Sequence, residues 1–263
     1  MRLGATLIAR DESRHIAACL ESLHWVDEIV VVVDDRTVDD TADVARRFTP
    51  HVHLRTFSGY SDQRQWADQR SSCDWVFSVD CDERVSADLA AEIRAVLSAP
   101  RHAAYRIPHL DYIFGKWIRH GGWYPQYHVR LYRRDAATWC RDVHEGVTAN
   151  GSVGRLVQPI HHFAHARVED WVDKLARYTT LEARAMWEGG ERMNLARLLL
   201  EPPGYAFSKL IVQQGWRDGA HGLALALLFG CYRLVRNLKL WDLQQSSRGP
   251  IESEQCPPSM SRR

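Results

Sequence analysis

Hydrophobic and polar positions follow two alternating patterns in the first hundred residues. Short apolar runs rich in strand-forming residues occupy residues 4–9, 28–34, 51–57 and 75–80, and such runs are typical of β-strands. Between them lie segments whose apolar residues recur every three or four positions, as in an amphipathic helix. Strands that alternate with helices predict an α/β fold, in which a mostly parallel sheet has helices on both faces.

Local residue types refine this prediction. Residues 29–33 are apolar without interruption, which predicts a central strand that is buried on both faces. Side chains that can accept hydrogen bonds from a first helical turn mark two helix starts, at Ser61 or Asp62 and at Ser86.

The pattern changes after Pro100. Residues 103–163 contain aromatic-rich, strand-like pieces separated by turns, which predict an antiparallel extension of the sheet. Residues 167–187 carry the apolar stripe of an amphipathic helix, and residues 205–240 are expected to be helical again.

Two further features concern the C-terminal part of the chain. Pro202 and Pro203 are expected to break the chain between the two helical segments, because proline lacks a backbone donor. The tail from Gln244 is rich in Ser, Gly and Pro, and we expect it to be disordered.

The overall charge and the cysteine content exclude several classes of protein. The net charge is +1, which argues against a general nucleic-acid binder, since such a protein needs a broad basic surface. The six cysteines form no CxxC pair and show no metal-ligand spacing. The N-terminal stretch lacks the apolar core of a secretory signal. We therefore expect a reduced, cytoplasmic, globular protein.

Two predicted strands end in acidic residues. Asp80 and Asp82 follow the strand at residues 75–80, and Asp34 ends the strand at residues 28–34. Ligands of such sheets bind beyond the carboxyl ends of the strands, and residues two apart in an extended chain point the same way. Two converging carboxylates predict a divalent cation, Mg²⁺ or Mn²⁺, that also binds substrate phosphates. The alternative is a solvated acidic turn beside the next helix.

The remaining acids of this sheet edge have less specific interpretations. Asp34 could accept a hydrogen bond from a base N–H group or from a ribose hydroxyl. Asp11 and Glu12 follow the first strand and belong to the same edge by topology. They could contact a nucleotide or stabilise the N-terminus of the next helix through its dipole.

Three stretches together resemble the family 2 glycosyltransferases of the GT-A fold, and within them the branch that includes lipopolysaccharide core glycosyltransferases. These stretches are LIARDESRHIAACLESL, DEIVVVVDDRTVDDT and DWVFSVDCDERVS. The later stretches VRLYRRD, DVHEGV, PIHHFAHARVEDWVDKLARYTTLEA and QQGWRDGAHGLALALL resemble the same branch. The similarity covers roughly residues 3–240, and the combination is more specific than any single motif.

The resemblance implies an inverting transferase that uses a nucleotide-diphosphate sugar, with UDP expected, and Mn²⁺ or Mg²⁺. Its implied donor-binding residues are Ala9, Asp11, Glu12, Asp34, Arg64, Asp80 and Cys81. Among these, Asp34 matches the base-recognising acid and Arg64 matches a basic residue of the family. Asp80 and Asp82 match the metal-binding pair. The chain departs from the family where Asp11 replaces asparagine and where Arg36 enters a turn that is usually rich in glycine and serine.

Inverting transfer needs a carboxylate outside the metal pair to deprotonate the acceptor hydroxyl. The resemblance points to Glu145 in CRDVHEGV, with Asp142 as the second candidate, although Glu145 could instead hold a loop. His162 in PIHHFAH matches a histidine of the family and could be a third metal ligand. A hydrogen-bonded histidine at a strand end is the alternative.

These assignments divide the chain into four regions, which are a nucleotide-sugar-binding half (1–100), an acceptor-side extension (101–166), a helical region (167–243) and a tail (244–263). The apolar segment 223–235 is shorter than the ~20 residues that a membrane span needs. Its basic flanks could instead place it on an anionic membrane surface. The alternative is a helix that packs on the catalytic domain.

The expected partners are a nucleotide-sugar donor and a glycan or glycolipid acceptor, used at the cytoplasmic face of the membrane, and not nucleic acid. One alternative is a nucleotidyltransferase, which would normally open with a Gly-rich basic loop that LIARDESR lacks. Another is a transferase fold that binds a nucleotide or sugar without catalysis. The Asp80 and Asp82 pair and Glu145 argue against the latter.

Overall fold

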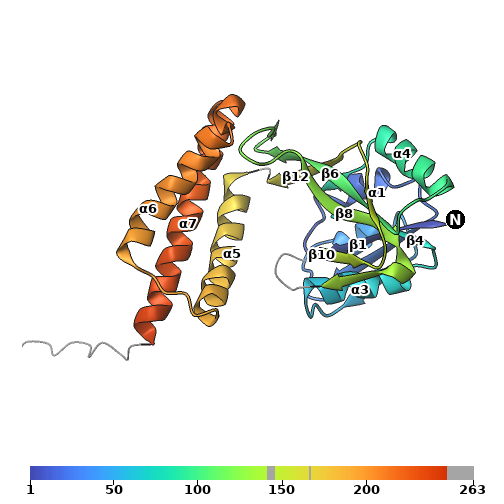
Figure 1. The fold of residues 1–263 in the computed structure, drawn as a ribbon. Coiled ribbons are helices and arrows are strands. Elements are labelled where there is room, and N and C mark those ends of the chain that lie inside the picture. Colours follow the sequence, from blue (N-terminus) through green and yellow to red (C-terminus); the bar gives the residue numbers. More distant parts are fainter. Residues whose placement is uncertain (141–145, 166, 248–263) are drawn as a thin grey trace, which may run out of the picture. The chain divides into compact units, whose positions relative to one another are not determined.

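The computed structural model describes residues 1–140, 146–165 and 167–247, and the chain forms two compact units, Met1–Ala166 and Arg167–Arg263 (Figure 1). The first unit contains a mixed β-sheet with helices. The described part of the second unit is helical.

The parallel half of the sheet is built from the first four strands. β1 lies between β2 and β4, β3 continues the sheet beyond β2, and all four run parallel. Their bounds are β1 Leu3–Ala9, β2 Glu28–Asp34, β3 Val52–Arg55 and β4 Trp75–Ser78. The accompanying helices are α1 Ile16–Glu21, α2 Thr41–Ala45, α3 Tyr60–Arg70 and α4 Ala87–Ser98 (Figure 1). This arrangement confirms the predicted α/β fold.

The second strand is buried on both faces, as the sequence predicts. Val31 belongs to the cluster that contains Leu20 of α1, whereas Val32 packs with Ala67 of α3. Since successive side chains of a strand point to opposite faces, the two helices cover opposite faces of β2.

The remaining strands extend the sheet, which has the order β3-β2-β1-β4-β8-β6-β12-β5. β8 pairs antiparallel with β4 and with β6, whereas β12 runs parallel to β6 and antiparallel to β5. The extension is therefore mixed rather than purely antiparallel. Its bounds are β5 Glu83–Arg84, β6 Ala104–Ile113, β7 Lys116–Trp117, β8 Gln126–Arg133, β11 Val153–Arg155 and β12 Ile160–His165, with η1 Arg134–Ala136 after β8 and a separate pair, β9 Ala137–Cys140 and β10 Gly146–Ala149.

The helix starts follow the sequence only in part. The Ser86 side chain accepts a hydrogen bond from the Leu89 backbone N–H group and caps α4, as predicted. The predicted helix α3 is present, but its predicted start at Ser61 or Asp62 is wrong, because the helix already begins at Tyr60. Its N-cap is Gly59, whose φ of 152° favours glycine.

The second unit consists of α5 Val168–Glu188, α6 Leu195–Phe207, η2 Ser208–Val212, η3 Gly215–Asp218 and α7 Ala220–Ser246. The expected break at Pro202 and Pro203 is wrong, since both lie inside α6. Pro202 is buried where α6 meets α7 at Gly230, and a Cβ atom at Gly230 would lie 3.2 Å from the Pro202 carbonyl oxygen. This close packing holds the helix together despite the missing donors.

The C-terminal helix also corrects the predicted start of the tail. α7 continues to Ser246, so Gln244 is helical rather than disordered. Residues 248–263 lie outside the described residues. In the described part of the chain, none of the helices has both the length and the apolar character needed to cross a membrane.

Candidate active site

The acids predicted at one sheet edge do lie at the carboxyl ends of neighbouring strands. Ala9, which is buried at the end of β1, pairs with Val33, directly before Asp34. On the other side of β1, the Val79 backbone N–H donates to the Thr6 carbonyl oxygen at 3.0 Å, just before Asp80. The fold therefore brings the ends of β1, β2 and β4 to one edge.

Helix α3 is fixed against this part of the sheet by Asp68. This buried carboxylate accepts hydrogen bonds of 2.8 Å each from Thr6 of β1, Tyr132 of β8 and the Trp139 indole of β9. Arg64 lies one turn earlier on the same helix face. Asp68 thereby positions the Arg64 guanidinium at the end of β4.

The Asp80 carboxylate lies between two buried guanidinium groups. Its Oδ1 pairs with Arg64 Nη2, and its Oδ2 lies 2.6 Å from Arg130 Nη2. Burial alone would raise the pKa of Asp80, but Arg130 and Arg64 outweigh it and hold the pKa well below its usual value. Asp80 is therefore ionised, and both of its oxygens are already bound.

The chain does not continue as a strand through the two acids, which corrects the geometric argument made from the sequence. The Glu83 backbone N–H donates to the Asp80 carbonyl oxygen at 3.0 Å, and the Asp80 backbone N–H donates to Glu83 Oε2 at 2.8 Å. This turn ends the period-two alternation at Asp80. Asp80 and Asp82 consequently have different partners.

Glu83 is fully buried directly behind this turn. Its Oε1 lies 2.8 Å from Arg130 Nη2 and 3.6 Å from His109 Nδ1. Burial raises the pKa of Glu83 to about 7, against the opposing effect of Arg130. Arg130 thus holds Asp80 and Glu83 together inside the protein.

Asp82 faces His162, which comes from a strand 80 positions later in the chain. The strand β12 places His162 opposite Glu83 of β5 on one side and Asp111 of β6 on the other. His162 Nε2 lies 3.5 Å from Asp82 Oδ2, and its Nδ1 lies 2.6 Å from Asp111 Oδ1. Burial by itself would lower the pKa of His162, but its hydrogen bonds to Asp111 and Asp82 hold the pKa well above its usual value.

Asp111 is a site residue that the sequence analysis missed. It is buried on β6, and it engages the imidazole nitrogen of His162 that points away from Asp82. Carboxylates that bind one nitrogen of a histidine commonly orient the other nitrogen toward a metal ion. The only indication in the sequence is the alternation of HLDYI, which places Asp111 on the same face as His109.

Further imidazoles lie beside this group. The ring of His109 lies 4.6 Å from that of His128 and 5.7 Å from that of His162. One ligand atom each of His109, Asp111 and His162 lies within 4.8 Å of the others. Burial lowers the pKa of His109 well below its usual value and that of His128 to about 4, so both rings are neutral at pH 7. Neutral imidazoles and carboxylates are suitable ligands for a transition metal.

Asp34 is buried at the end of β2, where the sequence predicted a base-recognising acid. Its carboxylate is bound by Arg36, with Nε at 3.1 Å from Oδ1 and Nη2 at 3.2 Å from Oδ2. Arg10 Nη1 lies 3.5 Å from Asp34 Oδ2. Burial raises the pKa of Asp34, but these hydrogen bonds and charges outweigh it and lower the pKa below its usual value. The unusual Arg36 thus covers the acid that was expected to bind the base.

The other predicted donor-binding residues lie in the same loops. Asp11 is exposed with a φ of 54°, and its Oδ1 accepts a hydrogen bond from the Val38 backbone N–H at 2.8 Å. The Glu12 backbone N–H donates to Thr41 Oγ1 at 2.8 Å. Both contacts tie the loop after β1 to the loop after β2. Cys81 is buried, and its thiol lies 3.5 Å from the Ile8 carbonyl oxygen.

The candidate catalytic base cannot be placed, because Asp142 and Glu145 lie outside the described residues. β9 ends just before them, at Cys140, and the Trp139 backbone N–H donates to Gln65 Oε1 of α3 at 3.0 Å.

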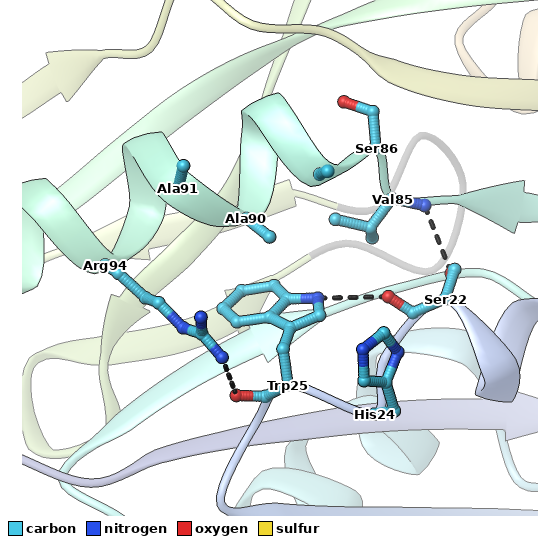
Figure 2. A pocket seen from close by; sticks show the side chains of 9 residues that line it. Ser22, His24, Trp25, Val85, Ser86, Ala90, Ala91 and Arg94 are labelled. Carbon is cyan, nitrogen blue, oxygen red and sulfur yellow. Dashed lines mark hydrogen bonds between the residues drawn. The ribbon is translucent and has the colours of Figure 1, made fainter.

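A pocket of about 240 Å³ lies elsewhere, between the end of α1 and the start of α4 (Figure 2). Its lining is mainly apolar and includes Trp25. The Trp25 indole N–H donates to the Ser22 carbonyl oxygen at 3.0 Å, and Arg94 Nη2 donates to the Trp25 carbonyl oxygen at 3.1 Å (Figure 2). It contains none of the predicted site residues.

The sequence model described as Glycosyl transferase family 2 matches residues 7–149, more than half of the chain. The chain belongs to this family. It is therefore a glycosyltransferase, and its mixed α/β sheet agrees with the GT-A fold that the sequence predicted.

Several known proteins are similar to this glycosyltransferase. The lipopolysaccharide core biosynthesis glycosyltransferase LpsC of Rhizobium meliloti is 28% identical over an alignment of 249 positions that covers 91% of this chain and 92% of LpsC. An uncharacterized glycosyltransferase of Rickettsia conorii is 25% identical over an alignment of 268 positions that covers 96% of this chain and 94% of the relative. Among solved structures, S. aureus TarS 1–349 in complex with UDP has a TM-score of 0.47 and 14% identity, covering 94% of this chain and 91% of TarS.

Proposed function

We propose that this glycosyltransferase transfers a sugar, with inversion, from a nucleotide-diphosphate sugar to a lipopolysaccharide or other lipid-linked glycan of the cell envelope. UDP is the expected nucleotide, and Mn²⁺ or Mg²⁺ is the expected ion. The observation that carries the proposal is the Asp82–His162–Asp111 arrangement beside the carboxyl end of β4. The name of LpsC supports the class of acceptor.

The residues present fit a divalent ion between Asp82 and His162. Ligand bonds of about 2.1 Å place two neighbouring ligand atoms roughly 3 Å apart. Asp82 Oδ2 and His162 Nε2 lie 3.5 Å apart, so a small movement closes them on one ion. Asp80 is less well placed than Asp82 for a ligand in this geometry, because each of its oxygens already binds a guanidinium group, from Arg64 or Arg130. Asp80 would instead hold the turn that presents Asp82.

A bound ion would stabilise the negative charge of the departing diphosphate. The chain's own residues have distinct tasks around it. His162 and Asp82 hold the ion, and Asp111 orients the His162 ring. At the nucleotide end, Asp34 accepts a hydrogen bond from the base once Arg36 has moved aside.

The acceptor hydroxyl needs a separate base, because the carboxylate that binds a metal cannot also take up a proton efficiently. We assign this role to Glu145 on the strength of the family resemblance, with Asp142 as the second candidate. A lipid-linked acceptor would place the enzyme at the cytoplasmic face of the membrane.

Thermal unfolding with nucleotides tests the proposal. The parent chain and Asp82→Asn are heated with UDP, GDP, CDP or dTDP, each with and without Mn²⁺. We expect UDP to raise the unfolding temperature of the parent only with Mn²⁺, because ligands stabilise the state that they bind. Asp82→Asn should lose this rise, and without ligand it should unfold at a somewhat lower temperature than the parent, because it also loses the contact with His162.

Asp88→Asn is the matched control, since Asp88 is an exposed acid in the first turn of α4. It should keep the full response to UDP and Mn²⁺. If no nucleotide stabilises the parent under any condition, the chain is a transferase fold without donor binding. If Asp82→Asn responds as the parent does, the metal assignment is wrong.

A further inference from the structure

The second unit exposes large apolar side chains over the segment from α6 to η3. Six of them are between 58% and 69% exposed, namely Leu195, Leu199, Leu200, Phe207, Val212 and Trp216. Monomeric proteins rarely leave so many large apolar side chains together in water unless they meet a partner or a membrane.

Part of this apolar surface, which is defined by those six residues, lies on the opposite side of α6 from its packed side. Leu198 packs into the cluster around Leu240 of α7, and Pro202 is buried near Gly230. At 100° per residue, Leu200 and Phe207 fall on the other side of the helix, whereas Leu199 lies on its flank and Leu195 at its first turn. The outer side of α6 is therefore apolar and lacks a cover within the described unit, and Val212 and Trp216 continue the apolar surface in η2 and η3.

The charges around the apolar surface are one-sided. Residues 195–240 contain six cations and only the acids Glu201 and Asp218. Four of the cations, Arg197, Arg233, Arg236 and Lys239, are engaged by groups of the second unit itself, and Lys209 and Arg217 are the cations of η2 and η3. Asp218 is buried, and Glu201 is bound by Arg236 at 2.6 Å and by Asn237 at 2.9 Å. The exposed pair Trp216 and Arg217 joins an apolar ring to a cation at the η3 turn, where Arg217 Nη1 donates to Gln214 Oε1 at 2.9 Å. Such a combination favours an anionic lipid surface.

The C-terminal tail is a poor candidate for covering this surface. Residues 248–263, RGPIESEQCPPSMSRR, contain two large aliphatic side chains, Ile251 and Met260. Two such side chains bury too little area to cover six.

We propose that the apolar surface on α6, η2 and η3 docks on an anionic lipid bilayer, with its leucines, Phe207, Val212 and Trp216 in the acyl–headgroup boundary. This inference deepens the proposed function, on which it rests for the lipid-linked acceptor. It adds α6, η2 and η3 to the apolar segment 223–235 that the sequence indicated, in which Leu225, Ala226 and Gly230 are buried within the unit while Leu223 and Leu227 are exposed.

Vesicle sedimentation of the full chain tests the proposal. The vesicles are phosphatidylcholine alone, or phosphatidylcholine with phosphatidylglycerol at a ratio of about 3:1, in low and high salt. We expect binding to the anionic vesicles that falls at high salt, because salt screens the cations. The double variant Phe207→Ala, Trp216→Ala should bind at least tenfold more weakly, since each buried CH₂ group contributes several-fold to partitioning.

Leu54→Ala, Val157→Ala is the matched control, because these side chains of the first unit are 58% and 75% exposed. It should bind vesicles as the parent does. The proposal is overturned if the parent does not bind anionic vesicles, or if the double variant Phe207→Ala, Trp216→Ala binds them with the same affinity as the parent. It is also overturned if light scattering shows that the parent is a dimer and that this double variant is a monomer, since the apolar surface then joins two copies of the chain. UDP and Mn²⁺ binding, measured by thermal unfolding of the same variants, separates a failure of this inference from a failure of the proposed function.

Discussion

Replacing Arg130 by methionine tests whether the buried ion network holds the acidic turn in place. Arg130 Nη2 contacts Asp80 Oδ2 at 2.6 Å and Glu83 Oε1 at 2.8 Å, and its side chain is only 11% exposed. Removing one partner of a buried ion pair costs about 3–5 kcal/mol. We expect a value near the lower end, about 3 kcal/mol, because Asp80 keeps Arg64 and Glu83 can take up a proton. For a unit of this size that corresponds to a fall in unfolding temperature of about 6–12 °C.

The loss of stability in Arg130→Met should increase with pH. The folded pKa of Glu83, about 7, lies above its ordinary value of 4.5, so Glu83 stabilises the folded state less as pH rises from 4.5 to 7. Without Arg130 the pKa of Glu83 rises further, and this decline continues above pH 7. The difference in unfolding temperature between the parent and Arg130→Met should therefore be larger at pH 8.5 than at pH 6.

Thermal unfolding followed by tryptophan fluorescence measures both effects. Arg133→Met is the control, because Arg133 lies on the same strand, is 54% exposed and pairs with the exposed Asp135. It should change the unfolding temperature much less than Arg130→Met does, since an exposed, solvent-screened ion pair contributes little to stability. The reasoning is refuted if Arg130→Met unfolds within 2 °C of the parent at pH 8.5, or if its deficit shrinks as pH rises.

Three further predictions concern binding and turnover. Arg36→Ala should bind UDP about two- to fivefold more tightly in calorimetry, because the ion pair with Asp34 that the base must displace is screened by solvent at Arg36 and is therefore weak. Asp111→Asn should weaken Mn²⁺ binding in the presence of UDP about 10- to 100-fold, as is typical when the carboxylate behind a metal-binding histidine such as His162 is replaced. Glu145→Gln should lower kcat by about 10²- to 10⁴-fold while donor binding stays intact, because a missing general base affects the chemical step alone.

Each of these variants has a control and a contradicting outcome. Arg46→Ala removes an exposed arginine that pairs with Asp43 and should leave UDP affinity unchanged, whereas weaker UDP binding by Arg36→Ala would make Arg36 a donor contact. Tyr112→Phe alters the neighbour of Asp111 on the other sheet face and should not change Mn²⁺ affinity. Equal Mn²⁺ affinity in Asp111→Asn and the parent would mean that Asp111 does not orient His162. Loss of UDP binding in Glu145→Gln would place Glu145 in the nucleotide pocket instead.

The sequence by itself determined the elements whose pattern is local. The uninterrupted apolar run of β2 predicted burial on both faces, and the packing of Val31 and Val32 on opposite helices agrees. The cap at Ser86 and the placement of acids at the ends of β2 and β4 could also be predicted from the sequence. Hydrophobic periodicity, strand ends and helix caps all depend on residues that are only a few positions apart.

Only the tertiary structure decided which charged groups meet. The Asp111–His162 contact joins residues 51 positions apart, and the Arg130–Asp80 contact joins residues 50 positions apart. Alternation along a strand tells which face a side chain occupies, but the sheet order decides its neighbours across that face. Asp80 and Asp82, two positions apart in the motif, face different partners because the turn from Asp80 to Glu83 ends the strand. Helix α6 continues through two prolines because Pro202 packs against α7 at Gly230.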